Sequence, residues 1–214
     1  MLRCAAMLRT LIALAVTVAT ARADTKVDWA RGLVIADAVG VADRHAPNPA
    51  VARGTSRRGA EANAKKLLAA KIADLPLAGG GKVGDRASDA DVKARLARAL
   101  EGAISLAADP ETDGAWRVTM AVPIEAVRQA IVGPRSLGDG DKGPRIVIVE
   151  GVSAKPAVGW KVGGLEAATV WAGDAPAWAK DAPRVKAKSA KAGAIEVPGI
   201  DASAATLFVI ITKP

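Results

Sequence analysis

One stretch of the chain, residues 50–74, limits the possible folds most strongly, because small and aliphatic residues recur in it at three- and four-residue steps. The apolar residues are Ala60, Ala64, Leu67, Leu68 and Ile72, and the basic residues around them are Arg53, Arg57, Arg58, Lys65, Lys66 and Lys71. This spacing puts the apolar side chains on one face of an α-helix. We therefore predict a long helix over 50–74 that packs by this face against another layer, where the two alanines allow close approach.

Shorter helices and several strands complete the pattern. Apolar spacing predicts helices at 89–102, with Ser88 as the N-cap, and at 124–132. Extended runs predict strands at 29–42, 104–108, 116–122, 145–152, 157–162, 168–171, 194–197 and 207–212. The Pro/Asp/Gly-rich turn at 109–114 favours an antiparallel hairpin between the two strands that it joins.

These elements define an α+β fold class. We expect a mixed or antiparallel sheet packed by the long helix and two shorter helices, followed by a β-rich C-terminal part. The expected organisation is a signal peptide at 1–23, an α+β domain at 24–133, a linker at 134–144 and a β-rich C-terminal domain at 145–214.

The N-terminal residues have the three parts of a secretory signal peptide. Arg3 and Arg9 precede a short apolar run at 11–18, and residues 21–23 (ARA) form an A-x-A cleavage site. The run is too short to span a hydrocarbon core about 30 Å thick, so no transmembrane helix is expected in the mature chain. Whether translation starts at Met1 or Met7 is left open. The pattern predicts a periplasmic or secreted protein that begins near Asp24.

The residue inventory excludes several kinds of chemistry. The chain has no Tyr and only one Phe, one His and one Cys, and the Cys lies inside the predicted signal peptide. Zinc sites, disulfide scaffolds and Cys–His nucleophiles are therefore excluded. The formal charge of +8 falls to +5 once Arg3, Arg9 and Arg22 are removed with the leader. An exported basic protein meets anionic headgroups and cell-wall polymers, so no nucleic-acid partner is expected.

Three short motifs resemble ligand-binding signatures, but each has a simpler interpretation. Residues 79–82 (GGGK) resemble a phosphate loop, yet Val83 stands where Ser or Thr would hold magnesium. Residues 139–141 (DGD) begin like a calcium loop, yet Pro144 takes the place of its turn glycine. His45 lies in a Pro/Asn-rich turn. We interpret them as a turn, an acidic linker and a solvent-facing side chain, and expect no catalytic residue, cofactor or metal.

The candidate contact site lies in the C-terminal part. Its residues are Trp178, Lys180, Arg184, Lys186, Lys188 and Lys191. Trp29, Trp116, Trp160 and Trp171 are expected in the core, because the chain has few other large rings. Two interpretations stay open for the segment around 180–191. It is either a mobile solvated loop or a contact with anionic envelope surfaces, in which Trp178 is an interfacial anchor.

The order of elements and the residues that mark them resemble those of a known family. The marks are Trp29, Gly32, Gly40, Asn48-Pro49, Ala52-Arg53, Ala60, Ala64, Leu67-Leu68, the strand and helix at 118–127 and the apolar strand and Lys-Pro-Ala turn at 146–157. They resemble the periplasmic family that groups small membrane-associated bacterial lipoproteins with the N-terminal domain of flagellar assembly protein T. The resemblance covers most of 27–162. It implies a structural and not a catalytic role.

The function expected from these observations is binding or assembly by an exported, non-enzymatic cell-envelope protein, similar to such a lipoprotein or to the flagellar assembly protein. The expected partner is an envelope protein or an anionic envelope surface. The alternative is a periplasmic hydrolase that acts through carboxylates, because Asp and Glu are plentiful in the chain.

Overall fold

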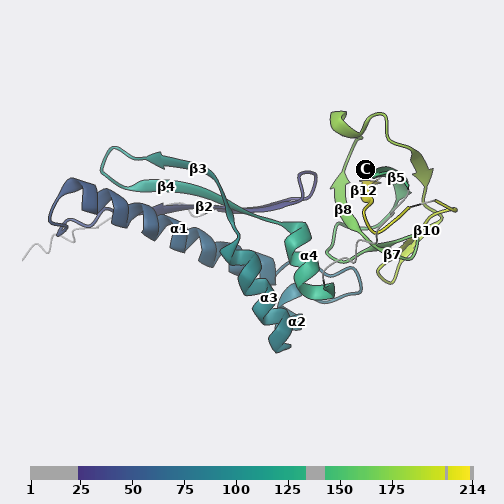
Figure 1. Cartoon of the computed structure of the whole chain (residues 1–214), viewed down its shortest axis with the longest axis horizontal. Helices are drawn as coiled ribbons and strands as arrows, with labels where there is room; N and C mark the ends of the chain where they lie inside the picture. Colours follow the sequence, from purple (N-terminus) through teal and green to yellow (C-terminus); the bar gives the residue numbers. More distant parts are fainter. Residues whose placement is uncertain (1–23, 134–142, 201, 213–214) are drawn as a thin grey trace, which may run out of the picture.

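The computed structural model describes residues 24–133, 143–200 and 202–212 of the 214-residue chain. It confirms the α+β fold class, with an antiparallel sheet, one long helix and a β-rich C-terminal part. An elongated N-terminal lobe and a rounder C-terminal lobe lie side by side (Figure 1). The predicted signal peptide and most of the predicted linker at 134–144 lie outside the described residues.

The N-terminal sheet has four antiparallel strands, in the order β1-β2-β4-β3. Their bounds are β1 Asp24–Asp28, β2 Leu33–Gly40, β3 Ile104–Pro110 and β4 Trp116–Pro123. The hairpin between β3 and β4 was predicted. The strand predicted at 29–42 forms over Leu33–Gly40 as β2, but its first four residues were predicted wrongly, because Trp29 lies in a turn between β1 and β2. The Asp28 carboxylate accepts a hydrogen bond from Arg31 N at 2.9 Å there, and Gly32 adopts φ +66°.

The long helix forms as predicted. Helix α1, Pro49–Ala73, begins at Asn48, whose side chain accepts a hydrogen bond from Val51 N at 3.0 Å, and Pro49 has no N–H to leave unpaired. Its apolar face lies along one face of the sheet (Figure 1). The buried helix residues are Ser56, Ala60, Ala64, Leu68 and Ile72, and they meet Val34, Ala36 and Ala38 of β2 and Val118, Met120 and Val122 of β4.

Helix α1 and β2 are in close backbone contact at Gly40. The Ser56 hydroxyl donates a hydrogen bond to Gly40 O at 2.5 Å. A Cβ atom on Gly40 would lie 1.9 Å from Ser56 O and 2.5 Å from Ala60 N. The contact therefore requires glycine on the strand and small residues on the helix.

Three shorter helices lie below the right-hand end of this sheet, near the end of α1 (Figure 1). They are α2 Val83–Arg86, α3 Ala90–Glu101 and α4 Ile124–Val132, and α3 packs against α4. The predicted N-cap of α3 is wrong by one residue. Asp89 accepts hydrogen bonds from Asp91 N and Val92 N, whereas the Ser88 hydroxyl donates to Asp85 O. A carboxylate at this position also interacts favourably with the helix dipole.

Two four-stranded sheets build the C-terminal lobe. The first is parallel, in the order β8-β12-β5-β9, and consists of β5 Ile146–Val152, β8 Ala168–Ala172, β9 Arg184–Lys186 and β12 Leu207–Thr212. The second has the order β10-β11-β6-β7 and consists of β6 Lys161–Val162, β7 Leu165–Glu166, β10 Ser189–Lys191 and β11 Ala194–Glu196. The strand predicted at 157–162 is wrong over most of its length. Val158 pairs instead with Leu77 of the N-terminal lobe.

Both faces of the parallel sheet are buried, which explains the apolar runs at 146–149 in β5 and 207–211 in β12. One face packs on the second sheet, in a cluster that includes Val147, Val149, Phe208 and Ile210. The opposite face, with Ile148 and Val209, packs against the segment at 175–182.

The two lobes meet through backbone hydrogen bonds and shared apolar side chains. Val158 N donates to Pro76 O and Ala78 N donates to Val158 O, both at 2.9 Å, and Trp171 N donates to Trp29 O at 3.0 Å. Trp29 packs against the main clusters of both lobes. The separation into domains at 24–133 and 145–214 stays a prediction.

No helix within the described part of the chain has the length and apolar character needed to cross a membrane.

Candidate functional site

Trp178 lies on a short turn that the C-terminal lobe holds in place. The turn is the 3₁₀ helix η1, Ala177–Ala179, which Pro176 begins and which a hydrogen bond from Ala179 N to Pro176 O closes at 2.9 Å. Ala179 is 2% exposed and packs with Ile148 and Val209. Trp178 beside it is 55% exposed. The small side chain therefore anchors the turn, and the large one faces solvent.

The five cations that follow belong largely to strands and not to a structureless loop. Arg184 and Lys186 lie on β9, at an edge of the parallel sheet, and Lys191 lies on β10, at an edge of the second sheet. The loop interpretation of this segment is therefore wrong at 184–186 and 189–191, which are strands. Alternate residues point inward, because Val185, Ala187 and Ala190 pack against the core of the lobe. The cations face outward and all are exposed.

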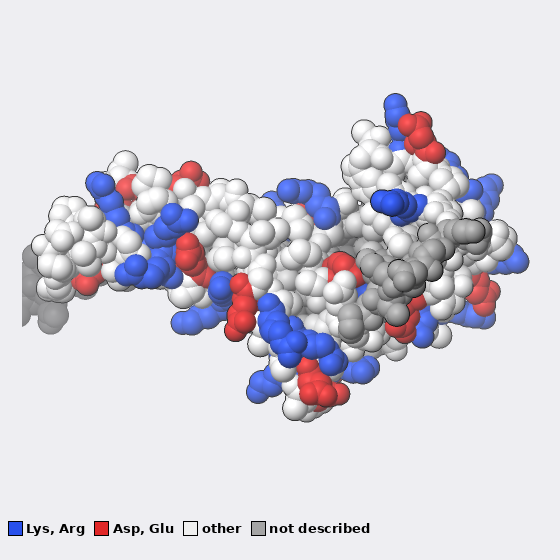
Figure 2. Space-filling view, in the orientation of Figure 1, with Lys and Arg blue, Asp and Glu red and all other residues white. Residues whose placement is uncertain are grey.

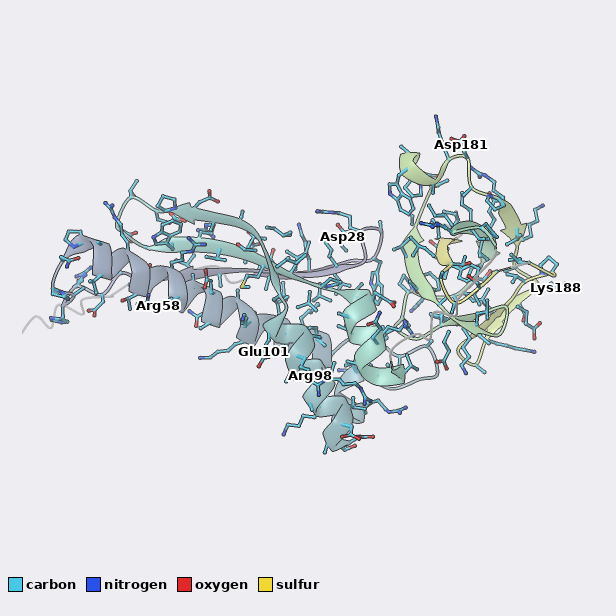
Figure 3. All side chains as sticks on the ribbon, viewed as in Figure 1. Asp28, Arg58, Arg98, Glu101, Asp181 and Lys188 are labelled. Atoms are coloured by element: carbon cyan, nitrogen blue, oxygen red, sulfur yellow. The ribbon has the colours of Figure 1, made fainter. Side chains whose placement is uncertain are left out.

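We refer to Trp178, Lys180, Arg184, Lys186, Lys188 and Lys191 together as the Trp178 surface. These residues lie along the outer side of the C-terminal lobe and do not form one compact cluster. Figure 3 labels Asp181 at one end of this lobe and Lys188 at another. Figure 2 shows acidic side chains between the basic ones along the rim.

Three carboxylates reduce the positive charge of the Trp178 surface, and one of them, the exposed Asp181, directly follows Lys180. Glu150 Oε1 pairs with Arg184 at 2.7 Å, and Glu196 accepts a hydrogen bond from Ser189 beside Lys188 and Lys191. Within the described residues the other four cations of the surface make no ion pair. Those four lysines are therefore available to an anionic partner.

The glycine-rich motif at 79–82 is a turn, as predicted, and the structure places this turn at the junction of the lobes. Leu77 N donates to Gly81 O at 3.0 Å, and a Cβ atom on Gly193 would meet Gly79 N at 3.2 Å. Lys82 Nζ lies 2.8 Å from Asp74 Oδ1. This hydrogen bond and the opposite charge lower the pKa of Asp74 and raise the pKa of Lys82. The lysine therefore has a carboxylate partner already.

The other candidate polar residues lie apart from one another. His45 is exposed in its turn, where its backbone N–H donates to Asp43. Asp37 accepts a hydrogen bond from the Thr119 hydroxyl on the sheet face away from α1, and Asp24 lies opposite it on β1. No cluster of three or more potential metal ligands occurs among the described residues. The DGD motif lies outside them.

Of the four tryptophans predicted for the core, Trp160 and Trp171 are buried there, whereas Trp29 and Trp116 are partly buried and pack against it. Trp160 and Trp171 are buried with ring centroids 5.8 Å apart and planes tilted by 56°, and Arg57 lies 5.4 Å from the centre of the Trp116 ring. The indole N–H groups of Trp116, Trp160 and Trp171 are buried without an acceptor in the described structure. These three rings fill the space between layers, as expected in a chain with one Phe.

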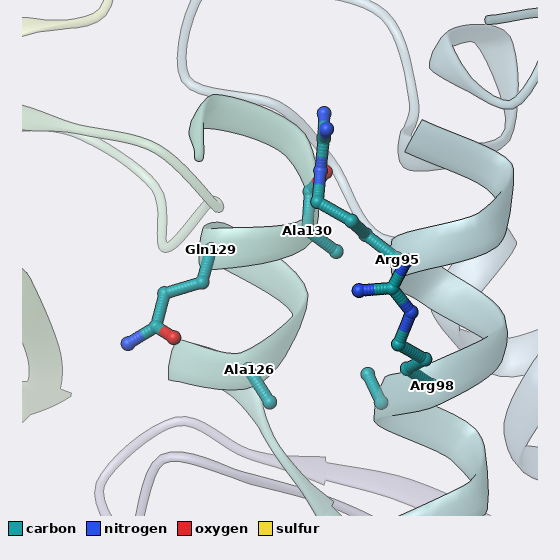
Figure 4. Close-up of a pocket in the computed structure, with 6 residues that line it drawn as sticks. Arg95, Arg98, Ala126, Gln129 and Ala130 are labelled. Carbon is teal, nitrogen blue, oxygen red and sulfur yellow. The ribbon is translucent and has the colours of Figure 1, made fainter. Parts of the chain in front are cut away.

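Sequence reasoning missed a pocket between α3 and α4. It is lined by Arg95, Arg98, Ala99, Ala126, Gln129 and Ala130, and its volume is about 320 Å³ (Figure 4). The sequence offers one signal for it, two arginines three residues apart on a helix. The facing alanines lie about 30 residues further along, so their proximity follows only from the packing of the helices.

No family model matches the chain, and no curated protein matches it either. The resemblance to periplasmic lipoproteins and to flagellar assembly protein T therefore stays a prediction.

Proposed function

We propose that this protein is an exported, non-enzymatic protein of the cell envelope that acts by binding or assembly, and that it contacts anionic envelope surfaces through the Trp178 surface. One observation carries the proposal. Trp178 is more than half exposed on a turn whose next residue is buried, and exposed cations follow it on two edge strands.

The chemistry of these side chains suits the boundary between water and a lipid headgroup region. An indole ring has an apolar body and a polar N–H, so tryptophan concentrates at such interfaces. Each basic residue near an anionic surface contributes about 1 kcal/mol, and the attraction decays within about 8 Å at physiological salt. Because Glu150 already binds Arg184, we attribute the attraction to the four lysines.

Binding to vesicles that contain an anionic phospholipid tests the proposal. We expect the full chain to sediment with such vesicles at low salt, and the bound fraction to fall as salt approaches about 1 M. Changing the five cations of the Trp178 surface to Gln should weaken binding at least about tenfold, since the loss of about 1.4 kcal/mol already has that effect. Trp178→Ala should also weaken binding. Because the contact of the indole ring is apolar, this substitution should reduce the residual binding at high salt as well.

A charge-matched variant provides the control. Five exposed cations of the N-terminal lobe can be changed to Gln instead, namely Arg53, Arg58, Lys66, Arg86 and Lys93. Val41→Ala is the control for Trp178→Ala, because it shortens an apolar side chain that is 76% exposed at the far end of the N-terminal lobe. Equal losses of vesicle binding in the control and test variants would contradict the proposal. Vesicle binding that changes neither with salt nor with the five substitutions would contradict it as well.

Export is tested separately. We expect cleavage after Ala23, which leaves Asp24 as the first residue, directly at the start of β1. Mass spectrometry of the protein from an exporting host should give the mass of 24–214. A mass that includes Met1 or Met7, or a lipid adduct, would contradict export by a cleaved leader.

The hydrolase alternative has one specific pair of residues to test, Asp37 and Asp24 on neighbouring strands. An unbiased substrate screen with purified protein should show no turnover. Turnover that is lost on Asp37→Asn while the thermal melt is unchanged would overturn the non-enzymatic proposal.

A further inference from the structure

We infer that the pocket between α3 and α4 binds a phosphate group carried by a small molecule. The pocket is separate from the Trp178 surface and lies on the N-terminal lobe. Alanines at 99, 126 and 130 leave space between the two helices, and the resulting volume of about 320 Å³ lies at the lower end of the range for small-molecule sites.

Two arginines line this pocket, which is open to solvent; Arg95 is partly buried and Arg98 is exposed. Arg95 and Arg98 are three residues apart on α3, so they lie on the same side of the helix. Figure 4 shows Arg98 extending toward Arg95, with Ala126 and Ala130 of α4 opposite them. The Arg95 guanidinium is turned toward Ala130, whereas that of Arg98 lies near the start of the Arg95 side chain, so each occupies its own position beside the pocket.

A structural role explains only one of the two arginines. Arg95 Nε donates to Ala130 O at 2.8 Å, in the last turn of α4, where a cation also interacts favourably with the helix dipole. Its two terminal nitrogens make no hydrogen bond to the described residues. Arg98 makes neither a hydrogen bond nor an ion pair with any of them.

The neighbouring carboxylates do not neutralise the pair. Asp91 and Glu101 stand one helical turn from Arg95 and Arg98, and both are exposed with no ion pair to either arginine. Glu125 on α4 accepts two hydrogen bonds from the buried Arg128 and one from Gln129. The positive charge of the pocket is therefore available to a ligand.

The charge and the lining together specify the class of ligand. A phosphate monoester carries a charge of about −1.5 to −2 at pH 7, which matches two guanidinium groups better than one carboxylate does. Guanidinium groups bind phosphate oxygens in a bidentate manner. The alanine side chains offer an apolar floor to the small organic group that bears the phosphate.

Titration calorimetry of the full chain with glycerol phosphate tests the inference. We expect saturable binding at millimolar concentration or below, with acetate binding at least about tenfold more weakly. Arg98→Gln should weaken glycerol phosphate binding at least about tenfold, since a charge-assisted hydrogen bond is lost. Arg98→Lys should restore part of the affinity, because it returns the charge without the planar fork.

Two controls separate this site from general charge effects. Lys93→Gln removes the same charge from an exposed position of α3 and should leave binding unchanged. The five-Gln variant of the Trp178 surface should also bind glycerol phosphate normally, so that failure of one proposal can be told from failure of the other. Vesicles whose lipid headgroup bears a phosphate test whether the phosphate comes from a lipid. We expect Arg98→Gln to leave vesicle binding unchanged, since the inferred ligand is a small molecule. If glycerol phosphate does not bind, or binds Arg98→Gln as tightly as the unchanged chain, the inference is wrong.

Discussion

Gly40→Ala should destabilise the protein by about 3 kcal/mol, the upper part of the range for overpacked contacts. The added Cβ would lie 1.9 Å from Ser56 O and 2.5 Å from Ala60 N, and both are backbone atoms of α1. Backbone cannot rotate away as the end of a flexible side chain can, so α1 must move off the sheet. That movement also breaks the hydrogen bond from the Ser56 hydroxyl to Gly40 O.

Gly54→Ala is the matched control for this substitution. Gly54 lies on α1, and a Cβ there would meet only the Arg58 guanidinium, at 3.6 Å. Alanine inside a helix is favoured over glycine by about 0.5–1 kcal/mol, so the control should raise the melting temperature. Denaturant melts followed by circular dichroism measure both variants. A Gly40→Ala protein as stable as the Gly54→Ala protein would show that α1 does not require the close contact.

The long helix and the hairpin could be predicted because their patterns are local and complete. In 50–74, apolar residues and cations alternate with the period of a helix, and Asn48-Pro49 marks the start. The turn between β3 and β4 contains Asp, Pro and Gly. For each of these elements, the residues that determine it lie within about 25 positions of one another in the sequence.

The strands β9 and β10 could not be recognised in the same way, because each is three residues long and contains one apolar residue, Val185 or Ala190. The sequence Arg-Val-Lys-Ala-Lys at 184–188 does alternate with the period of a strand, and this was the available signal. Its apolar side chains are small, so the alternation resembles a solvated loop. Pairing with β5, far away in the sequence, fixes β9, and a hairpin with β11 fixes β10.

The candidate sites show the same division. Trp178 could be predicted to be exposed, because proline and lysine stand close to it in the sequence. The position of its turn on the C-terminal lobe could not be predicted, since that position depends on Ala179 packing against Ile148 and Val209. The Arg95–Arg98 pocket could not be predicted either, because α4 supplies the small residues that leave space beside these arginines.

Phe208→Ala should cost about 3–5 kcal/mol, because it empties the centre of the C-terminal lobe. Phe208 is fully buried on β12 and belongs to the cluster that joins the two sheets of this lobe. It lies beside Val147 of β5 and Thr169 of β8, so the cavity would open in the middle of the parallel sheet. A domain of this size is stabilised by only about 5–15 kcal/mol in total. Phe208→Leu keeps most of the volume and should cost less than about 1.5 kcal/mol.

Phe208→Ala and a second substitution, Leu68→Ala, together test whether the two lobes unfold as one unit. Leu68→Ala opens a cavity in the N-terminal core and should cost about 2–5 kcal/mol. Because Val158 belongs to that core and Trp29 packs against both, we expect Leu68→Ala and Phe208→Ala each to shift one common unfolding transition. Two transitions, each sensitive to only one of the variants, would show that the lobes unfold independently. Vesicle binding should then survive Leu68→Ala at a temperature where the N-terminal lobe is unfolded, because the Trp178 surface lies entirely on the other lobe.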